Sequence, residues 1–118
     1  MTSTIQELTE QLVVFRDERD WAQFHTLKNL IGALAVQSAE LLELTQWKSD
    51  KVLESVEADE DTKKKFASEM ADVFAYLLLI CEKLNVDPIG ALEAKMAENA
   101  KRYSIEKSRG NATKYSDL

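Results

Sequence analysis

The sequence has 118 residues, enough for one domain with a modest hydrophobic core. Its formal net charge of −6 gives none of the cationic field that nonspecific binding to DNA or to an anionic membrane requires, so neither a nucleic acid polymer nor a membrane is an expected partner. The longest apolar run, at 73–81, is far shorter than the roughly 20 residues of a membrane-spanning helix. A single cysteine, Cys81, and an amino terminus without a basic patch before an apolar run predict a cytoplasmic protein.

The expected secondary structure is helical throughout. Glycine and proline are rare and no alternating strand pattern persists, so the predicted fold class is all-α. The acidic stretch 57–61 predicts a solvated turn, with Asp61 or Thr62 as the cap of the helix that follows, and Pro88 fits only the first turn of a helix. In chain order the predicted helices span about residues 2–25, 26–56, 62–84 and 88–105, the second either continuous or broken after Trp47.

These helices are expected to form one domain, residues 1–105, followed by a polar tail, 106–118. The tail is rich in polar residues, and we expect it to be mobile and to order only against a partner or ligand. The second and third helices carry apolar residues on every face. The prediction is therefore a four-helix bundle that is completed by oligomerisation.

Two acid pairs interrupt the apolar sequence of these two helices. Glu40 and Glu43 lie three residues apart on the second helix, and Glu69 and Asp72 repeat the spacing on the third. Acids at this spacing usually mark a solvated helix face, but two such pairs in adjacent apolar helices would place four carboxylates opposite one another. Like charges in that position must take up protons or find a cation. We therefore predict a metal site.

The expected metal follows from the ligand chemistry. Carboxylates without histidine or cysteine suit Mg²⁺, with Mn²⁺ as the alternative, rather than zinc. A di-iron bundle would need Glu-x-x-His pairs, and His25 has Ala22, not an acid, three residues before it. Because Mg²⁺ keeps coordination positions open for phosphate oxygens, a phosphate-bearing ligand is the natural partner.

Other residue types that such a ligand requires occur along the chain. The fourth helix carries a stripe of donors suited to a polyphosphate, although an ordinary basic helix end would look similar: Lys95, Asn99, Arg102 and Tyr103. Trp21 and Trp47 are either base-stacking planes or core residues, and His25 is either a ligand donor or a helix cap. Tyr76 is either a core ring or a neighbour of the acids.

The combined motifs resemble a known family. They are WxxFH at 21–25, ExxE at 40–43, ExxD at 69–72, KxxxNxxRY at 95–103 and the closing KY at 114–115. Together they resemble the MazG-like all-α nucleoside triphosphate pyrophosphatases, most closely the dCTP pyrophosphatase branch. The resemblance implies a subunit that assembles as a dimer or tetramer, Mg²⁺ at the acids, and hydrolysis of a (deoxy)nucleoside triphosphate, dCTP or a modified dCTP, to the monophosphate and pyrophosphate in nucleotide-pool house-cleaning.

The resemblance also implies roles by position. Glu40, Glu69 and Asp72 would be metal ligands, with Glu43 as a further candidate, and either Glu40 or Glu43 would activate the water that attacks the α-phosphorus. The residues expected to contact the substrate are Trp21, His25, Asn29, Gln37, Trp47, Tyr76, Lys95, Asn99, Arg102, Tyr103, Lys114 and Tyr115.

One position departs from the pattern of relatives, which commonly have a third acid where this chain has Gln37. A neutral amide oxygen there implies a weaker metal site, a substitute role for Glu43, or reduced activity. Two other classes of function therefore stay open for this chain. One is a non-catalytic nucleotide-binding or sensing bundle, which would bind nucleotide with Mg²⁺ but not turn it over. The other is a helical interaction module, which would respond to neither.

Overall fold

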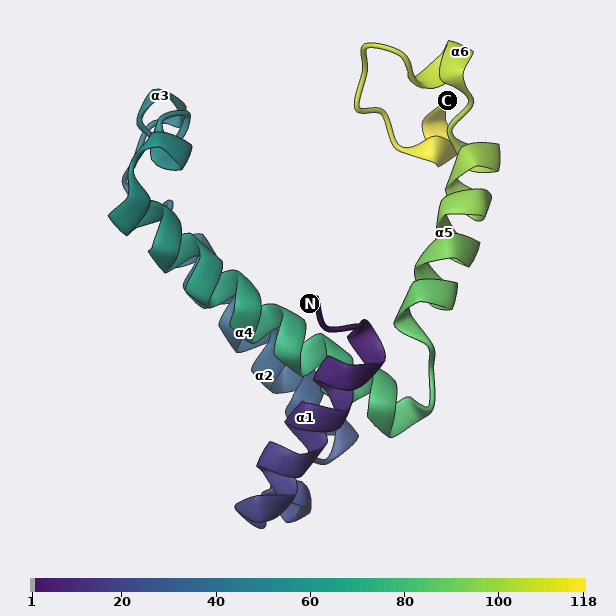
Figure 1. Ribbon diagram of the computed structural model, residues 1–118. Helices are drawn as coiled ribbons and strands as arrows, with labels where there is room; N and C mark the ends of the chain where they lie inside the picture. Colours follow the sequence, from purple (N-terminus) through teal and green to yellow (C-terminus); the bar gives the residue numbers. More distant parts are fainter. Residues whose placement is uncertain (1) are drawn as a thin grey trace. The chain divides into compact units, whose positions relative to one another are not determined.

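The computed structural model describes residues 2–118, and within that range it contains helices and connecting segments but no strand, as predicted for an all-α protein (Figure 1). By its contacts the chain divides into two compact units, one reaching to Asn85 and the other spanning Val86–Leu118. The predicted division into a 1–105 domain and a 106–118 tail stays a prediction.

The first helix, α1, spans Ile5–Glu18 and begins at a hydroxyl cap. The Thr4 hydroxyl accepts a hydrogen bond from the Glu7 amide at 3.1 Å. The helix ends earlier than the predicted 21–25, because Asp20 adopts the left-handed conformation (φ 54°), which no regular helix contains. A single 3₁₀ turn, η1 (Ala22–Phe24), follows it.

The second helix, α2, spans Leu27–Glu43 and is capped by Thr26. The segment is broken, as one of the two predicted alternatives has it, but the helix ends at Glu43, four residues before the predicted break after Trp47. The chain turns through 44–47 with Trp47 in the left-handed region (φ 64°), then forms the short helix α3 (Asp50–Leu53) and the 3₁₀ turn η2 (Val56–Ala58).

The longest helix, α4, spans Glu60–Leu84. Its cap is Asp59, whose carboxylate accepts from the amides of Asp61 and Thr62, so the predicted caps Asp61 and Thr62 lie two and three residues too late. The predicted stop is confirmed: Asn85 takes the left-handed conformation that closes a helix (φ 55°).

Helix α4 is the axis of the first unit, with α2 returning alongside it and α1 packed against it (Figure 1). Leu30, Leu79 and Ile80 are buried where these helices meet. The half-buried residues packed around them are Leu12, Leu27, Leu34 and Tyr76. Many large apolar side chains stay exposed, among them Leu42 (68%) and Phe74 (43%), so the apolar faces predicted for these helices are only partly covered within the unit.

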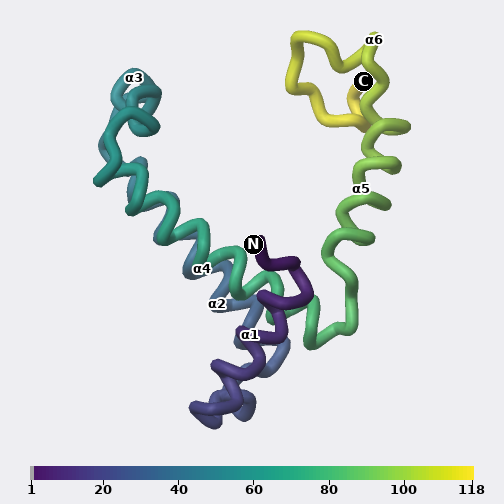
Figure 2. The backbone as a smooth tube through the Cα atoms, in the orientation of Figure 1, coloured from purple at the N-terminus to yellow at the C-terminus, as the bar shows by residue number. Residues whose placement is uncertain are grey.

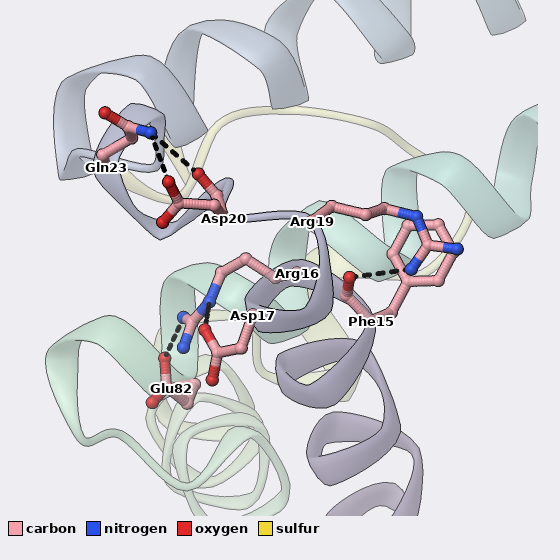
Figure 3. Close-up of polar contacts among 7 residues, drawn as sticks. All are labelled: Phe15, Arg16, Asp17, Arg19, Asp20, Gln23 and Glu82. Carbon is pink, nitrogen blue, oxygen red and sulfur yellow. Dashed lines mark hydrogen bonds and ion pairs between the residues drawn. The ribbon is translucent and has the colours of Figure 1, made fainter.

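A charged cluster fastens α1 to α4 (Figure 3). The Arg16 guanidinium binds Asp17 at 2.9 Å on its own helix and Glu82 of α4 at 3.5 Å. Nearby, the Arg19 guanidinium lies 3.5 Å from the Phe15 ring centroid, and the Gln23 amide donates to both the carbonyl and the carboxylate of Asp20. These contacts fix the turn that leads from α1 towards α2.

The second unit consists of α5 (Pro88–Arg102), α6 (Ile105–Ser108) and the 3₁₀ turn η3 (Tyr115–Asp117). Helix α5 stops short of the predicted residue 105, because Ser104 caps α6 and begins a new helix. The final segment returns to the end of α5 (Figure 2), where Tyr115 packs against Arg102 and Tyr103. Tyr115 thus has contacts within the chain, and the expectation that the tail orders only against a partner or ligand stays a prediction.

Among residues 2–118, no helix combines the length and the apolar character that crossing a membrane would require.

Candidate active site

The two predicted acid pairs lie on the two helices that pack along each other. Glu40 and Glu43 are on the last turn and a half of α2, and Glu69 and Asp72 are in the middle of α4. Glu40 and Glu69 are half-buried, whereas Glu43 and Asp72 are exposed. The packing of α2 on α4 therefore shields one carboxylate of each pair and leaves the other in solvent.

Glu69 has the most unfavourable surroundings of the four acids. Its Oε2 atom is shielded from solvent and finds no hydrogen-bond donor among residues 2–118. Desolvation raises the pKa of this carboxyl above its usual range, and the charge of Glu40, a hydrogen bond with the Glu40 carboxyl and the charges of Asp72 and Glu43 raise it further. Every cause of this shift raises the pKa, so the ionised form of Glu69 is electrostatically unfavourable within the part of the chain that the structure describes.

Gln37 precedes Glu40 by one turn of α2 and has a similar deficit. Its Oε1 atom is also shielded and lacks a hydrogen-bond donor within the described residues. Shielded acceptors without donors are uncommon in folded proteins and call for an explanation such as an ion. The carboxylates and this amide make an all-oxygen donor set, which fits Mg²⁺ or Mn²⁺ better than zinc.

The acids are neighbours, but they do not form a finished coordination shell. Among residues 2–118, no three side chains of the types His, Cys, Asp or Glu converge closely enough to hold a metal ion. An ion bound by three or four of these carboxylates would require side-chain movement from the present arrangement. The metal role of Glu40, Glu43, Glu69 and Asp72 stays a prediction.

The aromatic candidates for the nucleoside lie in different environments. Tyr76, one turn beyond Asp72 on α4, packs against the hydrophobic core. Trp21 is 44% exposed and meets the edge of Phe15, with ring centroids 5.8 Å apart. Trp47, in the turn after α2, is 94% exposed. The prediction that Trp47 is a core residue is therefore wrong. The alternative, a ring that stacks on a bound base, stays a prediction.

Trp47→Gly is expected to weaken nucleotide binding without harming the fold. A side chain that is 94% exposed contributes little packing, and glycine suits the left-handed backbone that tryptophan adopts at a cost of roughly 1–2 kcal/mol. The free energy of unfolding should stay the same or rise, while KM rises about tenfold through the loss of stacking worth about 1–3 kcal/mol. Chemical denaturation and steady-state kinetics check both parts. A destabilised variant with an unchanged KM would contradict the prediction.

His25 closes η1 just before α2 and is half-buried. Its Nδ1 atom is shielded and lacks a partner within the described residues. Burial lowers the pKa of His25, and the positive charges of Arg16 and Lys83 lower it further. The cap of α2 is Thr26, so the alternative of His25 as that cap is wrong. Asn29 donates its side-chain amide to the Phe24 carbonyl at 3.0 Å, which steadies the same turn.

His25 should make the protein less stable in mild acid. A histidine whose pKa is lowered by folding stays neutral in the native state, so the unfolded chain binds the proton first. Stability is therefore complete above the unfolded value of about 6.5 and is lost as the pH falls through that value towards the lowered native pKa. Denaturation of the wild type and His25→Gln between pH 8 and 5 checks this: the variant should lose less stability across the range. Parallel pH dependences would contradict it.

The phosphate candidates lie on α5 in the second unit. Lys95 and Arg102 both form ion pairs with Glu98, and Asn99 between them is half-buried. Tyr103 is 39% exposed, and Lys114 precedes the 3₁₀ turn that carries Tyr115. The sequence analysis missed Glu98, although its spacing of three and four residues from the two cations could have identified it.

Comparison with known proteins places this chain in a family. A family model described as MazG-like matches residues 33–118. The dCTP pyrophosphatase 1 of Rattus norvegicus is 37% identical to this chain over 115 residues. The Homo sapiens protein of the same name is 33% identical over 115 residues. Each alignment covers 98% of this chain and 68% of the relative. A crystal structure of a pyrophosphatase from Archaeoglobus fulgidus superposes with a TM-score of 0.77 at 38% identity, covering 88% of this chain and 95% of that one.

The described part of this chain is all-helical and carries acid pairs on two helices that pack along each other. The chain belongs to the MazG-like family. The resemblance found in the motifs is therefore confirmed.

Proposed function

We propose that this chain is a Mg²⁺-dependent enzyme that hydrolyses a deoxynucleoside triphosphate to the monophosphate and pyrophosphate, with dCTP or a modified dCTP as its substrate. At the level of enzyme class the chain is a nucleoside triphosphate pyrophosphatase, in keeping with its relatives. The observation that carries the proposal is the shielded, donorless oxygen of Glu69 beside Glu40, because such a pair is costly unless a cation binds there.

The proposed metal ligands are Glu40, Glu69 and Asp72. A bound Mg²⁺ would neutralise phosphate oxygens and orient the phosphate chain, and Mn²⁺ is a chemically similar substitute. Lys95, Asn99, Arg102 and Tyr103 are the proposed contacts of the phosphates and sugar. Positive charge there stabilises the charge that develops on the leaving pyrophosphate.

Glu43 is the better candidate for positioning the attacking water. A carboxylate that holds a metal is a poor base, and Glu40 is the acid whose charge acts most strongly on Glu69. Glu43 acts on Glu69 more weakly than Glu40 does and is exposed to solvent at the end of α2, where water reaches it. We therefore propose Glu40 as a metal ligand and Glu43 as the residue that positions the water for attack on the α-phosphorus.

The substrate preference rests on the relatives, two of which carry the name dCTP pyrophosphatase 1. The proposed nucleoside contacts are Trp21, His25, Asn29, Gln37, Trp47 and Tyr76. Trp47 offers the most accessible ring for stacking, and a neutral His25 is the proposed polar contact of the base. A role in the nucleotide pool of the cytoplasm would follow.

The test is pyrophosphate release from a panel of canonical and 5-modified deoxynucleoside triphosphates, with Mg²⁺ and with EDTA. We expect metal-dependent turnover that is fastest with dCTP or one of its modified forms. Calorimetric titration of the same nucleotides accompanies the assay. Mg²⁺-dependent binding without turnover would replace the enzyme with a nucleotide-sensing bundle, and no response to either would indicate an interaction module.

A second copy of the chain is the proposed cover of the exposed apolar surface. A groove between α1 and α4 is lined almost entirely by apolar side chains: Leu8, Gln11, Leu12, Phe15, Ala71, Phe74, Ala75 and Leu78. An apolar surface of this kind on a small domain with few buried residues fits an oligomer interface.

Light scattering at micromolar concentration tests the oligomer. The wild type is expected to be a dimer or tetramer, and Phe74→Asp to shift it towards the monomer because a charge in the interface would lose its hydration. Val52→Asp is the matched control, since Val52 is 55% exposed on α3, outside the groove. A monomeric wild type, or equal effects of the two variants, would refute the proposal.

A further inference from the structure

One carboxylate on α5 holds both cations of the proposed phosphate site. Oε2 of Glu98 lies 3.5 Å from the Lys95 ammonium, and its other oxygen, Oε1, pairs with the Arg102 guanidinium. All three side chains are partly exposed, at 55% for Lys95, 45% for Glu98 and 37% for Arg102. Such exposed pairs contribute little to stability, so substitution of Glu98 should leave the fold intact.

The carboxy-terminal segment contacts the same arginine. The Arg102 guanidinium carbon lies 4.5 Å from the centroid of the Tyr115 ring, in a cation–π arrangement. The Tyr115 ring in turn meets Tyr103 edge to face, with centroids 6.0 Å apart and an interplanar angle of 79°. Arg102 thus has an acid and an aromatic ring as partners from two separate elements, α5 and η3.

The net charge of Lys95, Glu98 and Arg102 affects how strongly they would bind an anion. Lys95 and Arg102 contribute two positive charges and Glu98 removes one, so Glu98 would weaken anion binding if charge alone mattered. A free arginine side chain, however, loses much rotamer freedom when it binds a phosphate, and a side chain already held in place loses less. Preorganisation therefore opposes the electrostatic cost of Glu98.

We propose that Glu98 and Tyr115 are positioning residues, which hold Arg102 and Lys95 ready for the phosphate chain and do not themselves contact the substrate. This inference rests on the proposed function and deepens it. It changes the role that resemblance assigned to Tyr115, from a substrate contact to a support for Arg102. The polar carboxy-terminal segment then serves the site by carrying the ring that packs on this arginine.

The test compares Glu98→Gln, Tyr115→Leu and Tyr115→Phe with Glu93→Gln, an acid on α5 that is exposed and forms no ion pair in the part of the chain that the structure describes. Steady-state kinetics are expected to show a loss of about three- to tenfold in kcat/KM for Glu98→Gln and Tyr115→Leu, mainly through KM, the size expected for one side chain that must be ordered on binding. Glu93→Gln should match the wild type. Tyr115→Phe should recover most of what Tyr115→Leu loses, because its ring keeps the cation–π face.

A second measurement follows Arg102 directly. Nitrogen-15 relaxation of the Arg102 side-chain Nε–H group is expected to show a lower order parameter in Glu98→Gln and Tyr115→Leu than in the wild type and Tyr115→Phe. A role of these residues that was confined to stability would leave the order of Arg102 unchanged once folding is verified.

Three results would overturn the inference. A lower KM in Glu98→Gln would mean that Glu98 competes with the phosphates for the two cations. A loss in Tyr115→Phe as large as in Tyr115→Leu would mean that the Tyr115 hydroxyl contacts the substrate. An unchanged order parameter of Arg102 in the variants would mean that Glu98 and Tyr115 do not hold its side chain in place. A wild type without turnover would refute the proposed function and would not by itself decide the inference. The inference would then be decided by calorimetry with inorganic pyrophosphate, whose affinity should fall three- to tenfold in Glu98→Gln and Tyr115→Leu if it is right and stay unchanged if it is wrong.

Discussion

Glu69→Gln is expected to remove Mg²⁺-dependent turnover while making the metal-free protein more stable. The amide keeps the shape of the side chain but brings no charge to a shielded position beside Glu40, Asp72 and Glu43. Loss of a charged ligand from the proposed metal site should lower kcat/KM by roughly 10²–10³-fold. Removal of a poorly placed carboxylate should raise the thermal midpoint at neutral pH, because the site holds strain that the metal would relieve.

The pH dependence separates this explanation from a general effect on folding. A carboxyl whose pKa is raised in the native state carries no penalty while it is protonated in both states, and it destabilises the native state as the pH rises through the raised value. The variant should therefore gain stability over the wild type at pH 7 and lose that advantage below the unfolded value of about 4.5. Mg²⁺ should raise the midpoint of the wild type but not that of the variant.

Differential scanning calorimetry with and without Mg²⁺, between pH 4 and 8, makes these comparisons. Glu18→Gln at the end of α1 is the matched control, since it removes the same charge from an exposed position. Equal midpoints for Glu69→Gln and the wild type at pH 7, or an equal response to Mg²⁺, would argue against a metal at the acids.

Gln37→Glu is expected to tighten Mg²⁺ binding about tenfold, the lower end of what changes around a metal site produce. The Gln37 side chain already has a shielded oxygen without a donor, one turn from Glu40, so a carboxylate there would add charge where an acceptor exists. The same charge adds repulsion in the absence of metal, so the metal-free variant should be less stable at neutral pH.

Isothermal titration with Mg²⁺ and thermal denaturation in EDTA measure the two effects. Gln46→Glu, an exposed residue of the turn after α2, adds the same charge to solvent and should change neither by much. Mg²⁺ affinity that is unchanged in Gln37→Glu would mean that this oxygen does not face the ion. Turnover in Gln37→Glu but not in the wild type would show that the glutamine at position 37 prevents catalysis.

The sequence by itself determined the features that depend on neighbours within one helical turn. The Thr4 hydroxyl caps α1 by accepting a hydrogen bond from the Glu7 amide three residues on, and Asn85 with Pro88 separates α4 from α5. Helical periodicity likewise identified the all-α fold, and the motif spacing identified the family. Errors in helix ends, such as Asp59 capping α4, arose where several adjacent polar residues offer similar caps.

The tertiary structure alone decided what depends on residues far apart in the chain. Helical spacing placed Glu40 and Glu69 on suitable faces, but only the packing of α2 on α4 shields them and raises the pKa of Glu69. The spacing equally allowed Trp47 to be a core residue, and the backbone turn exposes it instead. The Arg16–Glu82 pair and the contact of Tyr115 with Arg102 follow the same rule, because side-chain burial and charge proximity are properties of packed elements, which no periodicity along a single helix encodes.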